Sequence, residues 1–168
     1  MTDEADYNDP DHCTVGVVGE VGNRLFLFYV RQGLTETTVK VEKQQIAVLA
    51  GYLGRIVKEL GRPGHLPDDL SFDGTEDPEW VVGTIGVSYD EEIDRVVVVL
   101  EEVHDEDEGE ESGHVLRIAL TREQAAAFTI HATRLVEAGR PPCPLCGLPL
   151  DPSGHDCPRT NGHRPPVT

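Results

Sequence analysis

Positive charge is scarce in this chain. Lysine and arginine together number 14 against 31 aspartates and glutamates, which gives a net charge of −17 at pH 7. From Arg140 onward three arginines face two aspartates, so this tail carries +1 and the residues before it carry −18. A body this acidic repels nucleic acid and anionic lipid at long range, and neither is an expected partner.

Long apolar runs are also missing. No stretch approaches the roughly 20 residues that a membrane span needs, and the first six residues, Met1-Thr2-Asp3-Glu4-Ala5-Asp6, are too acidic for a signal peptide. We therefore expect a cytoplasmic protein without membrane contact. The 38% of hydrophobic residues is enough for a globular protein with a core of ordinary size.

Familiar catalytic patterns are absent from the sequence. There is no Gly-x-Ser-x-Gly, no His-Glu-x-x-His and no glycine loop that would cradle a phosphate. The acidic run Asp105–Glu111 lacks the spacing and closing glutamate of an EF-hand, and is typical of a hairpin tip. The sequence therefore indicates no particular reaction.

What the sequence does contain is a repeated order of elements. Apolar β-branched runs predict strands over 14–19, 23–30 and 35–41, and a spacing of three and four from Glu42 predicts a helix that ends at Gly61. The same order recurs with strands over 80–87, 95–100 and 115–120, followed by a helix from the capping box at Thr121 to Gly139. Matching residues recur in the two halves, with the extra residues of the second half in its turns, which suggests an internal duplication.

These patterns predict an α+β fold built from two β-β-β-α units with antiparallel sheet. The units span 13–61 and 80–139, between a disordered acidic N-terminus over 1–12 and a tail over 140–168, with a linker over 62–79. The linker, rich in Pro, Gly and Asp, is either a plain connection or a functional loop. The two units either join edge to edge or pack as two layers.

The tail contains a cluster of potential metal ligands. Two cysteines separated by two residues direct both sulfurs at one centre from a tight turn, and a second pair of ligands about ten residues later closes a tetrahedral Zn²⁺ site. The predicted structural zinc-knuckle-like site consists of Cys143, Cys146, His155 and Cys157, with His163 as the rival fourth ligand. A redox Cys-x-x-Cys is the weaker alternative, because this pair lies in a proline-rich loop. Cys13 is predicted to be a small buried residue.

Several motifs together resemble an actinobacterial family of uncharacterised proteins, a domain of unknown function of about 180 to 190 residues. The resemblance covers nearly the whole chain after the first dozen residues, and the tail motif is its most specific part. It implies an intracellular setting and a phosphate- or thiol-related pathway, but no assigned activity. The motifs are Gly16-x-x-Gly19-x-x-Gly22-x-Arg24-x-Phe26, the run from Val41 to Leu49, Trp80-x-Val82-Gly83, Gly139 to Gly147, and His155-x-Cys157-Pro158-Arg159-Thr160-Asn161-Gly162.

Two classes of function follow from these features. The first is a zinc-bearing binding or adaptor module that presents its scaffold to a protein partner, because a closed four-ligand metal set is structural. The alternative is an enzyme or enzyme subunit acting on a phosphorylated or thiol metabolite. Its anion contacts would be four basic residues at equivalent strand and helix starts in the two units, where helix N-terminal amides also lie: Arg24, Lys43, Arg95 and Arg122.

Overall fold

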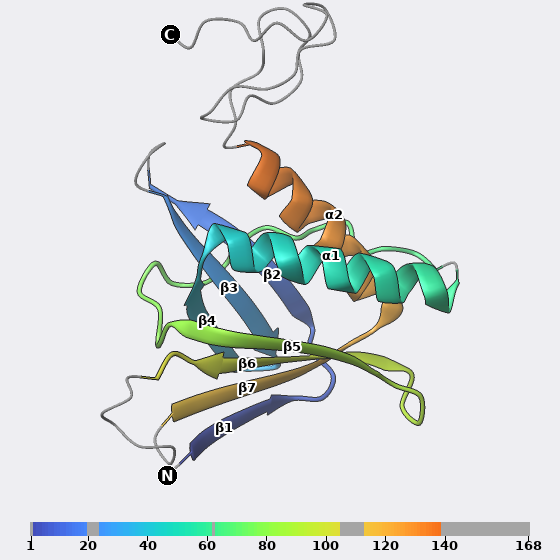
Figure 1. The fold of residues 1–168 in the computed structure, drawn as a ribbon, viewed down its shortest axis with the longest axis horizontal. Coiled ribbons are helices and arrows are strands. Elements are labelled where there is room, and N and C mark those ends of the chain that lie inside the picture. The colour runs from blue at the N-terminus through green and yellow to red at the C-terminus, as the bar shows by residue number, and fades with distance from the viewer. Residues whose placement is uncertain (1, 20–23, 62, 105–112, 139–168) are drawn as a thin grey trace, which may run out of the picture.

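The computed structural model describes residues 2–19, 24–61, 63–104 and 113–138, which form two β-sheets and two helices (Figure 1). One sheet has the strand order β1-β7-β6-β5 and the other β2-β3-β4. The predicted α+β class with two helices and antiparallel strands is confirmed. The elements are β1 Thr2–Tyr7, β2 His12–Val18, β3 Leu25–Gln32, β4 Thr35–Val41, α1 Lys43–Leu60, β5 Val82–Asp90, β6 Arg95–Glu102, β7 Gly113–Leu120 and α2 Arg122–Ala138.

The β2-β3-β4 sheet is buried on both faces. One cross-strand row, Val15, Phe28 and Val39, belongs to the common core. The neighbouring row, Thr14, Tyr29 and Thr38, points to the opposite face, since successive residues of a strand alternate, and it is equally buried. Some other part of the chain must therefore cover that opposite face.

The cover is the segment predicted as a linker between the two units. The hydroxyl of Thr14 donates to the carbonyl of Leu70 at 2.6 Å, and the imidazole Nε2 of His12 bonds the carbonyl of Ser71 at 2.7 Å. The ring of Phe72 packs edge-on against that of Tyr29 with centroids 5.8 Å apart. The segment is thus a structural cover of the first sheet, and its backbone carbonyls satisfy side chains that the sheet buries.

The N-terminus corrects the sequence prediction. Residues 1–12 were expected to be disordered, but Thr2–Tyr7 form β1, which pairs in parallel with β7. Glu4 and Asp6 alternate with Ala5 and Tyr7, so the acidic composition hid a strand with one apolar side. Tyr7 is buried, and its hydroxyl lies 2.6 Å from that of Thr37. The sheet is therefore mixed and not purely antiparallel.

The backbones of the two sheets are bridged next to the start of β5. Lys40 of β4 forms an isolated parallel bridge with Val81, just before β5, and its backbone N–H donates to the carbonyl of Trp80 at 2.9 Å. Elsewhere the described residues of β4 and β5 are not paired with each other. Both alternatives from the sequence hold in part, since the sheets touch at an edge and face one shared core.

Each helix packs across the junction between the two units. α1 presents Ile46, Leu49 and Leu53 to the core and lies along β5, the first strand of the second unit, while α2 lies along β2, the first strand of the first unit (Figure 1). The helices also pack on each other. Neither helix of the described chain is both long and apolar enough to cross a membrane.

Candidate binding surface around helix α1

The predicted zinc ligands lie outside the described residues. Cys143, Cys146, His155, Cys157 and the rival His163 all fall in 139–168. Within the described ranges no group of three or more His, Cys, Asp or Glu side chains is placed to hold a metal ion. Cys13, in contrast, is described and buried as predicted, and burial raises the pKa of its thiol.

The structure divides the four predicted anion contacts between two ends of the molecule. Arg24 precedes β3 and Lys43 opens α1, whereas Arg95 opens β6 and Arg122 opens α2. Figure 1 shows the starts of β3 and α1 at the left and those of β6 and α2 at the right. The four side chains are therefore not gathered into one site.

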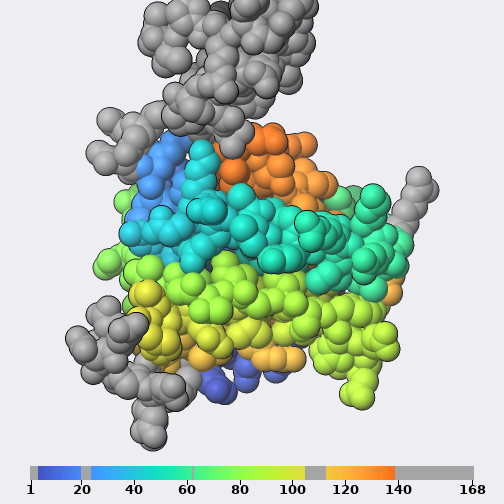
Figure 2. Space-filling model, in the orientation of Figure 1, coloured from blue at the N-terminus to red at the C-terminus, as the bar shows by residue number. Residues whose placement is uncertain are grey.

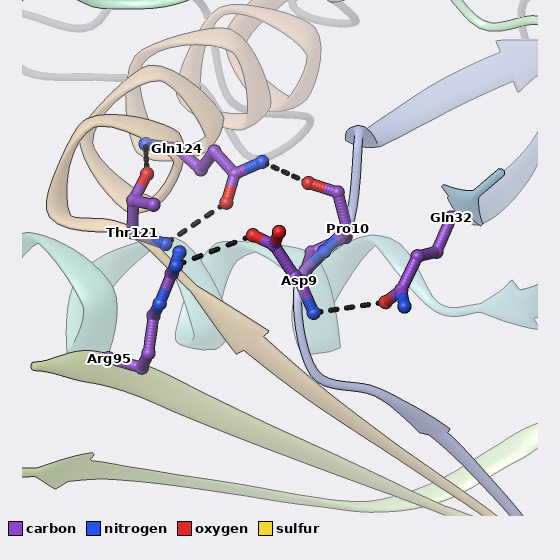
Figure 3. Close-up of polar contacts among 6 residues, drawn as sticks. All are labelled: Asp9, Pro10, Gln32, Arg95, Thr121 and Gln124. Atoms are coloured by element: carbon purple, nitrogen blue, oxygen red, sulfur yellow. Dashed lines mark hydrogen bonds and ion pairs between the residues drawn. The ribbon is translucent and has the colours of Figure 1, made fainter. Parts of the chain in front are cut away.

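The second pair is already engaged with acidic and carbonyl groups. Arg95 Nη2 donates to Asp9 Oδ1 at 3.3 Å (Figure 3), while its Nη1 is buried and has no hydrogen-bond partner within the described chain. Arg122 donates to Asp94 at 3.1 Å and to the carbonyl of Leu60 at 2.7 Å. The hydrogen bonds from Tyr89 and from Arg122 lower the pKa of Asp94. These contacts tie the end of α1 to the start of α2.

Helix α2 is bonded to β2 at one residue and to the segment just before β2 at another. Gln124 accepts the backbone N–H of Thr121 with its Oε1 at 3.0 Å and donates from Nε2 to the carbonyl of Pro10 at 2.7 Å (Figure 3). Two turns further on, His131 Nε2 bonds the carbonyl of Val15 at 2.9 Å. The helix therefore closes the outer edge of β2.

Helix α1 approaches β5 in the same way at its start. Gln45 accepts the N–H of Glu42 with Oε1 at 2.8 Å and donates from Nε2 to the carbonyl of Val82 at 3.1 Å. This repeats the contact of Gln124, because each glutamine is the third residue of its helix. The two helices differ seven residues after these glutamines. Tyr52, the tenth residue of α1 as His131 is of α2, is 49% exposed.

A crevice opens beside Tyr52, where α1, within the described residues, makes no counterpart of the bond between His131 and β2. It has a volume of about 330 Å³ and runs between α1 and β5, which lie side by side along the visible face in Figure 2. Its lining is mainly apolar, with one side chain of each charge: Tyr52, Arg55, Ile56, Glu59, Ile85 and Val87. Ile85 is the fourth residue of β5, as Val15 is of β2.

A second groove flanks α1 on the side of α2. Its volume is about 540 Å³, and Gly51, Gly54 and Thr129 are among its lining residues. The hydroxyl of Thr129 donates to the carbonyl of Ala125, four residues earlier in α2, so it is satisfied within its own helix. Arg55 lines both depressions and lies over the Tyr52 ring at 5.9 Å.

The exposed ridge between these depressions is the strongest candidate for a binding surface. We call it the α1 ridge and define it as Val48, Tyr52 and Arg55. Val48 is 47% exposed, so the ridge presents two large apolar side chains to solvent in a strongly acidic protein. Exposed apolar patches beside grooves mark interaction sites more often than scattered single side chains do.

The α1 ridge was not predicted from the sequence. Val48 and Tyr52 lie off the stripe of buried α1 positions that begins at Ile46. Apolar residues outside the buried stripe of a helix are a sequence signal for an exposed apolar surface. A second signal is that β5 has no charged residue before Asp90, its last residue. Edge strands usually carry a lysine or proline that discourages pairing.

Comparison with known proteins places the chain in a family. A family model described as "Protein of unknown function (DUF3090)" matches residues 5–157, and the chain belongs to this family. No curated protein and no solved structure gives a significant match.

Proposed function

We propose that this DUF3090 protein is a cytoplasmic binding or adaptor module. The scaffold of sheets and helices presents the α1 ridge to a protein partner, and the tail carries a structural Zn²⁺ ion. The two units derive from an internal duplication, after which one copy kept its helix sealed against the opposite sheet and the other left a surface open.

The observation that carries the proposal is the difference between Tyr52 and His131. At the same helical position, His131 fills the junction between α2 and β2, whereas Tyr52 stands half exposed beside an apolar crevice. Tyrosine is enriched at the centres of protein interfaces because its ring is large and rigid and its hydroxyl tolerates solvent before binding. This favours recognition of another protein.

The enzyme alternative has less support from the geometry. It relied on Arg24, Lys43, Arg95 and Arg122 meeting at one concave anion site, but these residues open elements at two ends of the molecule. Arg122 is bonded to Asp94 and to a helix carbonyl. A phosphorylated or thiol metabolite would therefore find no shared pocket among these four side chains.

The sequence pattern and the extent of the family match support the zinc proposal. The match runs to Cys157, so it includes Cys143, Cys146, His155 and Cys157 and stops before His163. This favours His155 as the fourth ligand. Three thiolates and one imidazole would form a closed tetrahedral set, which stabilises a fold and leaves no position for substrate.

Quantitative comparison of proteins that co-purify from the native cell tests the partner. The full-length chain, Tyr52→Asp and Ile130→Asp are expressed at equal levels, and Ile130 serves as the control because it is 44% exposed on α2 and lines neither depression. We expect at least one protein to be lost with Tyr52→Asp only. Equal recovery of every protein by the three chains would contradict the proposal.

Metal analysis of untagged protein tests the zinc site separately. We expect about one equivalent of zinc per chain, lost on Cys143→Ser or Cys157→Ser and retained on Cys13→Ser, because four-ligand sites bind one ion. Retention on His163→Ala with loss on His155→Ala would identify the fourth ligand. Metal-free protein with freely reactive tail thiols would refute the site.

A further inference from the structure

The edge of β5 is open for pairing along most of its length. In the described residues β5 is the last strand of its sheet and pairs only with β6. At its start Gln45 bonds the carbonyls of Val82 and, more weakly, Gly83. No backbone hydrogen bond from another described segment reaches the strand beyond that point.

The face of β5 turned away from α1 is also uncovered in part. Gly86 is exposed, and a Cβ added there would meet no atom within 4 Å. The residues of β5 that face α1, Ile85 and Val87, are only half buried and line the crevice. Unpaired N–H and C=O groups beside apolar sockets are what an added strand requires, because the main chain supplies affinity and alternate side chains supply specificity.

The edge strand β2 of the other sheet differs from β5. Cys13 to Gly16 of β2 are all buried, and α2 lies along this strand, where His131 bonds the carbonyl of Val15. In β5, exposed and half-buried residues alternate from Thr84 to Ser88. The same helix–strand arrangement therefore closes one edge and leaves the other available.

We propose that the crevice between α1 and β5 binds an extended segment of a partner protein, which adds to the edge of β5 as a fifth strand of that sheet. This rests on the proposed function, since it assigns the occupant of the same surface. Alternate apolar side chains of the segment enter the crevice against Tyr52, Ile56, Ile85 and Val87.

Charge defines the chemistry of the segment further. Arg55 and Glu59 line the crevice with one charge of each sign, so the acidic surplus lies at the end of β5. Asp90 is the last residue of this strand, and Glu91 and Glu92 follow it. The net charge of −17 attracts a positive chain at long range and opposes pairing of β5 with a second copy of this protein. The partner segment therefore carries lysine or arginine beyond the end that meets Asp90.

Selection of short random peptides displayed on phage, with the full-length chain as bait, tests this directly. We expect enriched sequences with apolar residues at alternate positions and a basic residue near one end. A synthetic copy should bind the protein, and Tyr52→Asp should weaken this binding about tenfold or more, which equals 1.4 kcal/mol or more. Ile130→Asp should leave it unchanged. Absence of enrichment, or equal binding by both variants, would overturn the proposal.

Backbone methylation of the selected peptide separates strand pairing from side-chain contact alone. Two versions of the peptide are made, in which alternate backbone amides are N-methylated. Because alternate amides point to opposite edges of a strand, each version loses the hydrogen-bond donors of one edge. Pairing with β5 predicts that one version loses binding and the other retains it. If both bind, the peptide does not add to the sheet, while the α1 ridge can still recognise a folded partner in the co-purification experiment.

Analytical ultracentrifugation of the full-length chain tests whether a second copy of the protein occupies the crevice. A monomer at all concentrations supports a heterologous segment. A concentration-dependent dimer that Tyr52→Asp dissociates would show that a second copy takes the crevice and would overturn the proposed occupant.

Discussion

The two units share an order of three strands and a helix but complete their sheets differently. In the first, β2-β3-β4 gain a cover on the second face, where Leu70 and Ser71 accept bonds from the sheet and Phe72 packs on Tyr29. In the second, β5-β6-β7 gain a fourth strand, β1, at the edge beyond β7. One unit is thus closed by a layer and the other is extended in its plane.

This difference shows how similar units come to have different surfaces. The first unit ends with both faces of its sheet buried and its β2 edge sealed by α2. The second keeps the edge strand β5, to which, among the described residues, only Gln45 adds hydrogen bonds from outside the sheet. Since each helix lies on the strand of the other unit, neither unit has a complete core alone. We expect them to unfold together.

The largest effect should come from Phe28→Ala. Phe28 of β3 is buried and packs on Phe128 of α2 with ring centroids 5.6 Å apart. We expect a loss of about 3 to 5 kcal/mol in the free energy of unfolding, because a large cavity opens between the two units. The measurement is denaturant unfolding followed by circular dichroism and by the fluorescence of Trp80, the one tryptophan.

Trp80 lies at the start of the second unit, so its signal decides whether the units are coupled. Coincident shifts of both signals indicate one cooperative transition. A Trp80 transition that stays in place while the circular dichroism becomes biphasic would show that the units are independent. Leu34→Ala, a change at a fully exposed residue, should alter neither signal.

Substitution of two glycines compares the covered sheet with the open edge. A Cβ at Gly16 would lie 2.5 Å from the ring of Phe72, so Gly16→Ala should displace the cover and cost about 1 to 3 kcal/mol. Gly86→Ala, where the same group meets open space, should change the free energy of unfolding by less than about 0.5 kcal/mol. Thermal and denaturant melts of both variants measure this difference, and equal costs would contradict it.

The glutamines at the third helical position test the similarity of the units. Gln45→Ala and Gln124→Ala each remove one bond at the helix start, and they also remove bonds to Val82 at the start of β5 and to Pro10 just before β2, respectively. Each should cost about 1 to 2 kcal/mol, and the double variant should show nearly the sum. Markedly unequal costs in denaturant melts would mean that the two helix starts do different structural jobs.

The smallest effect concerns a side-chain pair of the second unit. His114 donates from Nδ1 to Glu102 at 2.8 Å, and this hydrogen bond holds the pKa of Glu102 below its ordinary value of 4.5. A depressed carboxyl pKa stabilises the fold above that value and loses its contribution as the pH falls through the folded pKa. Glu102→Gln should therefore flatten the loss of stability below pH 4.5 by up to about 1 kcal/mol.

Denaturant melts at a series of pH values measure this contribution. Parallel stability curves for the two proteins between neutral pH and pH 3 would show that the pair contributes nothing to the acid transition.

Sequence periodicity was sufficient for the helices and for six of the strands, because their apolar residues recur at helical or alternating spacing. It failed at β1, where Glu4 and Asp6 fill the outward positions of a strand. It also failed at the cover, because Leu70 and Phe72 belong to no regular element. The sequence could not show that each helix packs against the first strand of the other unit, because an apolar stripe on a helix can pack on either sheet. The crevice beside Tyr52 depends on that crossing.

The proposed zinc ligands come from sequence alone, because the spacing of cysteines indicates a metal site without any knowledge of the fold. The α1 ridge came from the structure, because an exposed tyrosine on a helix has meaning only once its neighbours are known.

Amide hydrogen exchange on the full-length chain tests the central contrast between the edges of β2 and β5 most directly. The amides that point away from the neighbouring strand are compared, since those paired within a sheet are protected in either case. We predict slow exchange along Cys13 to Gly16, beneath α2, and fast exchange from Thr84 to Ser88, slowed when the selected peptide is bound. Equal protection of both edges in the free protein would mean that α1 seals β5 as α2 seals β2, and would contradict the account.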